Sequence, residues 1–134
     1  EIGKAEVIRD GADAVLLGLG NMLELAQEAA CQLEAQGIST AVVNPRWIKP
    51  LDTGLLERYA RNARVIGTVE DHVLANGFGS AVIEHLSEAG LRTPVVRIGW
   101  PDAFIEHGGI GVLRKKHGVT AEALVEKVLR ALEG

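Results

Sequence analysis

Short runs of apolar residues alternate along the chain with longer segments whose apolar residues recur at helical spacing. The runs are rich in Val, Ile, Leu and Ala, and a run without alternating polar residues is typical of a strand buried on both faces of a sheet. We therefore predict four buried strands, at Ala14–Leu19, Thr40–Asn44, Arg64–Val69 and Pro94–Ile98.

Helices are predicted between and after these strands, because apolar residues three and four positions apart form one buried face. Asn21 is expected to cap the first helix, with Glu24 completing a capping box and Gly37 ending the helix. The residues expected to begin the later helices are Asp52 or Thr53, Gly77 and Thr120.

This alternation predicts an α/β fold with a mainly parallel sheet covered by helices on both faces. Lys4–Arg9 is predicted to be a short strand ended by the turn Asp10-Gly11, which makes it the candidate for an antiparallel edge. No repeat or linker divides the 134 residues, so we expect one domain over residues 1–134. The sequence begins at Glu1 and not at Met, and we expect a piece of a larger protein.

Composition narrows the classes of function. Aromatic residues make up 4% of the chain and the net charge is −4, so base stacking and attraction to nucleic-acid phosphates are both disfavoured. No apolar run approaches the roughly 18 residues of a membrane span, and we expect no membrane partner. Cys31 is single, which rules out an intrachain disulfide or a CxxC pair and favours a cytoplasmic location.

A glycine-containing turn, Gly18-Leu19-Gly20, lies between a predicted strand and a predicted helix, where dinucleotide-binding proteins carry a GxGxxG motif. Leu23 occupies the third glycine position, and the next strand ends in Asn44-Pro45 without the expected ribose-binding acid. The match to the motif therefore fails. A free-standing nucleotide or flavin binder that holds phosphate at this turn is kept as an alternative.

The polar corner Glu70-Asp71-His72 follows a predicted strand and precedes the segment Gly77–Ser80. Ligands and partners of open α/β sheets gather at such carboxyl ends of strands. Because neighbouring residues of a strand point to opposite faces, Glu70 and Asp71 should not share a proton, whereas Glu70 and His72 could share a face. We interpret the corner as a site of capping and hydrogen bonding, with an acid-base or metal role for Glu70 and His72 as the alternative.

Two further histidines have different expected settings. His107 lies in a predicted loop, Phe104–Gly111, that could face a neighbouring domain or subunit, and a catalytic role is its alternative. His85 is expected on the inner face of its helix, in or beside the core. The chain has no G-x-S-x-G sequence and no P-loop, so hydrolase and NTPase functions lack their essential residues.

Three groups of residues, taken in order, resemble the C-terminal domain of transketolase-like enzymes, and the resemblance covers essentially the whole chain. The last group is more particular to the branch of the family that makes 1-deoxy-D-xylulose 5-phosphate. The groups are Asn44–Asp52, then Val69–His72 with Gly77–Ser80, then Gly99–Asp102 with Phe104–Gly108.

The resemblance implies a three-layer α/β/α domain whose five-stranded sheet has an antiparallel first strand. It implies a homodimeric parent enzyme that condenses pyruvate with glyceraldehyde 3-phosphate, releases carbon dioxide and begins isoprenoid precursor synthesis. In this family thiamine diphosphate and magnesium are held by a Gly-Asp-Gly motif in an upstream domain, and that motif is missing here. We therefore expect this chain to contain no catalytic, cofactor-binding or metal-binding residue and to be inactive alone.

The role that the resemblance leaves for the chain is packing on upstream domains of its own polypeptide and support of the homodimer. An alternative with the same fold is the C-terminal domain of a 2-oxoacid dehydrogenase β subunit, which binds an acyltransferase core. The candidate domain or dimer contacts are Glu70, Asp71, His72, Trp100, Phe104 and His107.

Overall fold

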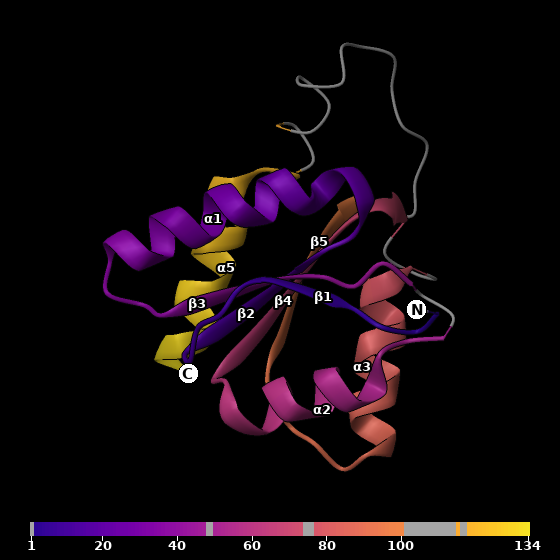
Figure 1. Cartoon of the computed structure of the whole chain (residues 1–134). Helices are drawn as coiled ribbons and strands as arrows, with labels where there is room; N and C mark the ends of the chain where they lie inside the picture. Colours follow the sequence, from indigo (N-terminus) through magenta and orange to yellow (C-terminus); the bar gives the residue numbers. More distant parts are fainter. Residues whose placement is uncertain (1, 48–49, 74–76, 101–114, 116–117) are drawn as a thin grey trace.

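A five-stranded mixed sheet in the order β1-β3-β2-β4-β5 forms the centre of the molecule (Figure 1). The computed structural model describes residues 2–47, 50–73, 77–100, 115 and 118–134, with the backbone alone for residues 72 and 73. The strands are β1 (Glu6–Arg9), β2 (Ala14–Gly18), β3 (Thr40–Asn44), β4 (Val65–Val73) and β5 (Val95–Trp100).

Four of the strands run parallel and the first runs against them. β2 pairs in parallel with both β3 and β4, and β4 pairs in parallel with β5. β1 pairs antiparallel with β3, and not with β2, which follows it in the sequence. The predicted α/β class, the mostly parallel sheet and the antiparallel edge strand are confirmed.

Helices cover both faces of this sheet (Figure 1). One face packs on α1 (Leu23–Ala35) and α5 (Ala121–Glu133), and the other packs on α2 (Thr53–Asn62) and α3 (Phe78–Glu88). The side chains of the two cores are mostly aliphatic, with Leu16, Leu33 and Leu124 fully buried on the first face and Val15, Ile66 and Val82 on the second. β2, β3 and residues 65–70 of β4 are almost wholly buried because each face of the sheet has its own helical layer, whereas β1 is mostly exposed and the first half of β5 is half-buried.

The predicted helix caps are correct at two helices and wrong at one. Asp52 accepts a hydrogen bond from the backbone N–H of Leu55 at the start of α2, and Thr120 accepts one from Ala123 at the start of α5. Asn21 does not cap α1, because a 3₁₀ turn (η1, Gly20–Met22) precedes that helix and no side chain caps it. The Asn21 side chain is thereby free to reach β4.

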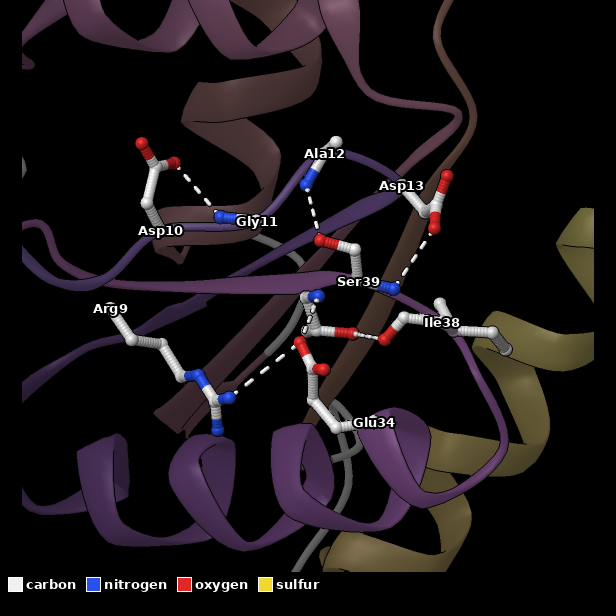
Figure 2. A network of polar contacts seen from close by, with 9 residues as sticks. Arg9, Asp10, Gly11, Ala12, Asp13, Glu34, Ile38 and Ser39 are labelled. Carbon is white, nitrogen blue, oxygen red and sulfur yellow. Dashed lines mark hydrogen bonds and ion pairs between the residues drawn. The ribbon is translucent and has the colours of Figure 1, made fainter.

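At the amino ends of the parallel strands, a network of polar contacts joins the β1–β2 turn to the α1–β3 loop (Figure 2). Asp13 accepts a hydrogen bond from the backbone N–H of Ser39 at 2.9 Å, and the Ser39 hydroxyl accepts one from the N–H of Ala12 at 2.9 Å. A Cβ atom at Gly11 would lie 2.3 Å from the backbone of Thr40, so only glycine permits this close approach. The network fixes the edge strand to the rest of the sheet.

None of the described helices is both long and apolar enough to cross a bilayer. The predicted loop Phe104–Gly111 lies outside the described residues.

Candidate functional site

The carboxyl ends of β2, β3, β4 and β5 lie along one edge of the sheet because these strands are parallel. The pairing of β4 with β5 becomes irregular here, where Val69 pairs with Ile98 and Val73 pairs with Trp100. Three residues of β4 (70, 71 and 72) therefore face one residue of β5 (99). Bulges of this kind are common beside functional sites because they redirect side chains.

Glu70 is fully buried and caps α3 from outside the helix. Its two carboxylate oxygens accept hydrogen bonds from the backbone N–H groups of Phe78 and Gly79, both at 2.6 Å. Gly77 at the N-cap position has no side chain to do this, and the positive end of the helix dipole favours the carboxylate. Glu70 is thus committed to holding α3 on the sheet.

Asp71 bonds to different elements from its neighbour, as the strand geometry predicts. The indole N–H of Trp100 donates to one carboxylate oxygen of Asp71, and the side-chain amide of Asn21 donates to the other at 3.3 Å. Asp71 therefore joins the ends of β4 and β5 to the turn before α1. Glu70 and Asp71 have separate partners, and this arrangement does not form a pair that shares a proton.

A small group of polar side chains packs under the start of α3. The guanidinium of Arg97 donates to the Ser80 hydroxyl at 2.9 Å, and the Thr68 hydroxyl is buried without a hydrogen-bond partner in the described part of the chain. A Cβ at Gly79 would lie 2.7 Å from the Thr68 hydroxyl and 3.1 Å from Glu70 Oε2. Gly79 is required for this close packing of α3 on β4.

Sequence reasoning missed three residues of the site: Thr68, Arg97 and Asn21. Thr68 could have been found, because it lies two residues before Glu70 on the same strand face. Arg97 and Asn21 reach the site through pairing of β5 with β4 and through the turn before α1, which single-sequence patterns do not specify.

The structure brings together some of the predicted contact residues and leaves others undescribed. Asp71 and Trp100 are in contact, and Trp100 is 7% exposed. Glu70 lies on the same strand but contacts α3. His72 belongs to β4 by its backbone, and its side chain lies outside the described part, as do Phe104 and His107.

His85 lies away from this edge, half-buried between α3 and α2, where its Nε2 is 2.9 Å from Glu57 Oε2. The hydrogen bond with His85 lowers the pKa of the Glu57 carboxyl below its ordinary value. This contact agrees with the predicted position of His85 beside the core.

The described residues offer no ligand set for the magnesium ion that accompanies thiamine diphosphate. In residues that the structure describes, no three His, Cys, Asp or Glu side chains are grouped as metal ligands would be. A Cβ at Gly18 would lie 2.8 Å from the Leu23 backbone, so the glycine serves packing of the α1 start against β2.

Comparison with known proteins places this geometry in a family. Residues 3–124 match the family model described as "Transketolase, C-terminal domain". A curated relative from Methylacidiphilum infernorum, named 1-deoxy-D-xylulose-5-phosphate synthase, is 53% identical over 98% of this chain. A second, from Acidobacterium capsulatum and with the same name, is 52% identical over 95%. The chain spans about a fifth of the length of these relatives, 21% and 20% respectively.

Solved structures show the same fold. One described as "Split gene transketolase, inactive beta4 tetramer" has a TM-score of 0.92 and 40% identity, covering 99% of this chain and 43% of that one. A transketolase from Leishmania mexicana has a TM-score of 0.65 at 18% identity, covering 98% of this chain and 18% of that one, which supports the fold alone. The expected resemblance, including the synthase branch, is confirmed.

Proposed function

Because the chain belongs to the transketolase C-terminal domain family, we propose that it is the non-catalytic C-terminal domain of a 1-deoxy-D-xylulose-5-phosphate synthase. The observation that carries this proposal is 53% identity to a synthase over 98% of the chain. The parent enzyme would use thiamine diphosphate and magnesium to convert pyruvate and glyceraldehyde 3-phosphate into 1-deoxy-D-xylulose 5-phosphate and carbon dioxide. It would supply isoprenoid precursors in the cytoplasm.

Within that parent, the domain would pack on the preceding domains and support a homodimer. The geometry favours this role over catalysis, because Glu70 is occupied by two backbone N–H groups and Asp71 by Trp100 and Asn21. Asp71 and Trp100 would form the described part of the contact surface, and Glu70 would act indirectly by holding α3. The other proposed contacts are His72, Phe104 and His107.

The test begins with the parent chain that contains residues 1–134. Purified parent should release carbon dioxide from pyruvate when glyceraldehyde 3-phosphate is present, and it should sediment as a dimer. Deletion of residues 1–134 should remove the activity and the dimer together. An active dimer after the deletion would refute the assembly role, and a parent without carbon dioxide release would refute the synthase assignment.

A point variant separates assembly from general folding. His107→Ala should weaken the dimer while leaving the far-ultraviolet circular dichroism spectrum unchanged. His117→Ala provides the control at another histidine that is not among the proposed contacts, and it should leave the dimer intact. Equal effects of the two changes would argue against His107 as a contact.

One observation favours a second candidate, the corresponding domain of a transketolase. The structure at 40% identity with a TM-score of 0.92 is described as a split-gene transketolase. The same purified parent should therefore be assayed with xylulose 5-phosphate as the ketol donor and no pyruvate. Turnover of this donor in place of pyruvate would favour the transketolase. The names of these relatives do not favour the 2-oxoacid dehydrogenase or nucleotide-binding alternatives.

A further inference from the structure

The chain leaves β3 through a strained turn centred on Arg46. The backbone N–H of Trp47 donates to the Pro45 carbonyl at 2.7 Å, and Arg46 has φ of 64°. A hydrogen bond from residue i+2 to residue i with positive φ at the central residue defines the rarer and more strained form of γ-turn. Among the residues that the structure describes, Arg46 is the one non-glycine residue with positive φ.

The Arg46 side chain does not explain its own backbone conformation. Arg46 is exposed, and within the described part of the chain its guanidinium makes no hydrogen bond or ion pair. The turn is held instead by the neighbouring strand end, where the Asn44 side chain accepts from the Arg46 N–H at 3.1 Å. Strained residues that the surroundings hold in place concentrate at binding sites. Glycine would adopt this φ without strain. The presence of arginine at this position therefore points to a contact that its guanidinium makes outside the described residues.

The next residue adds a second feature of a binding anchor. Trp47 is half-buried, and its indole N–H is enclosed without a hydrogen-bond partner in the described part. Arg and Trp are the residue types most enriched among the few side chains that dominate binding energy at interfaces. Here they are adjacent on a fixed turn.

The position of the turn indicates which part of a longer parent protein would contact it. β3 ends at the carboxyl edge, and β1 begins there because it runs antiparallel to β3. Ile2, which is 71% exposed, therefore lies on this side of the sheet, and a Cβ at Gly3 would lie 3.1 Å from the Pro50 ring. In a parent of the length of the relatives, the preceding domains join the chain beside this turn.

We propose that Arg46 is an interdomain anchor whose guanidinium forms an ion pair with a carboxylate side chain of a preceding domain. The inference rests on the proposed function, since it requires a parent chain with further domains. A planar guanidinium binds a carboxylate through two parallel hydrogen bonds, which fixes orientation as well as adding affinity. The strained turn holds this group toward the partner before the domains meet, so less freedom is lost on docking.

The test uses the intact parent and hydrogen exchange at the surfaces of its preceding domains. Arg46→Gln removes the charge, and Arg46→Gly removes the charge and relieves the backbone. Both should raise exchange at the docking surface at least about 10-fold, as expected for an interface anchor. Arg46→Lys keeps the charge and should have a smaller effect. Arg92→Gln is the control at an exposed arginine preceding β5, and it should have none.

Two results would overturn the proposal. Unchanged exchange in both Arg46→Gln and Arg46→Gly would show that no docking contact depends on the guanidinium. A 10-fold rise in KM for an anionic substrate, with exchange unchanged, would assign Arg46 to substrate binding instead. Exchange is measured without turnover, so a parent that fails the carbon dioxide assay still tests the anchor. If deletion of residues 1–134 abolishes the dimer while the Arg46 variants behave as wild type, the assembly role stands and the Arg46 anchor is refuted.

Discussion

The indole N–H of Trp100 donates a hydrogen bond to the carboxylate of Asp71, which joins the last residue of β5 to the bulged end of β4. A hydrogen bond to a charged group contributes about 1.5–3 kcal/mol to stability. Trp100→Phe removes the donor and keeps most of the ring, so it should lower the free energy of unfolding by about that amount. Urea titration of the chain measures the change.

The control for this prediction is Trp47→Phe. The Trp47 indole N–H has no hydrogen-bond partner in the described part of the chain, so its removal should cost less than the removal of the Trp100 N–H. In a double-mutant cycle with Asp71→Asn, Trp100→Phe should couple and Trp47→Phe should not. Equal costs and no coupling would show that the Asp71 contact adds little.

Glu70 should be essential to the start of α3. In Glu70→Gln, the side-chain amide keeps one acceptor, and one of the two backbone N–H groups of Phe78 and Gly79 loses its partner. A buried donor left unpaired costs about 1–3 kcal/mol. We expect this loss of stability, together with faster hydrogen exchange at these two amides measured by NMR.

Glu84 provides the matched control because it is an exposed glutamate on the same helix. Glu84→Gln should change the free energy of unfolding by less than about 0.5 kcal/mol. If Glu70→Gln were equally mild, the cap at α3 would be formed by backbone geometry alone.

Alanine should have opposite effects at two helical glycines. A Cβ at Gly79 would lie 2.6 Å from Arg97 Nε and 2.7 Å from the Thr68 hydroxyl, whereas nothing lies within 4 Å of a Cβ at Gly54. Gly79→Ala should destabilise the chain by about 1–3 kcal/mol through overpacking. Gly54→Ala should stabilise it by about 0.5 kcal/mol, because alanine favours the helix. Thermal unfolding monitored by circular dichroism compares the stabilities of the two variants. A Gly79→Ala variant more stable than the wild type would contradict the close packing under α3.

The hydrogen bond from the Tyr59 hydroxyl to Asp10 should make stability depend on pH at both extremes. It lowers the pKa of the Asp10 carboxyl below its ordinary 3.8. Burial is the larger cause, and the bond to Asp10 the second, that raises the pKa of Tyr59 above its ordinary 10.0. The Asp10 contribution is therefore present above pH 3.8 and lost as the pH falls further. The Tyr59 contribution is present below pH 10.0 and lost as the pH rises through the raised pKa.

Tyr59→Phe should flatten both limbs of the stability profile. Urea unfolding measured from pH 3 to pH 11 tests this, with Asp13→Asn as a control that alters the same network without touching Tyr59. A Tyr59→Phe profile that is parallel to the wild type at both ends would show that the hydroxyl contact does not form in solution.

The buried layer of the fold could be predicted because the sheet is covered on both faces. Continuous apolar runs such as Ala14–Leu19 and Thr40–Asn44 have no other stable environment, so they specified the strands and the helical layers around them. Helix capping could also be predicted at Asp52 and Thr120, because each side chain accepts a hydrogen bond from a backbone N–H within the same helical turn.

The prediction was wrong where long-range contacts compete with a local motif. Asn21 and Glu24 have capping-box spacing, yet the 3₁₀ turn at Gly20–Met22 gives Asn21 a partner fifty residues away on β4. The contact between Asp71 and Trp100 depends on a bulge in the pairing of β4 with β5, which leaves no signal in either segment alone. The sequence pointed to this segment of the chain, whereas its internal contacts had to come from the structure, and its role as a contact surface stays a prediction.

The antiparallel first strand separates the two ends of the polypeptide. The chain enters β1 at the carboxyl edge, whereas the end of α5 lies at the opposite edge, where the side chain of Arg64, just before β4, donates to the Leu132 carbonyl. Figure 1 shows the N- and C-termini on opposite sides of the molecule. A fluorophore or surface tether attached after Gly134 would thus stand clear of the Arg46 and Trp100 side, leaving that side accessible to an arriving partner in a binding measurement.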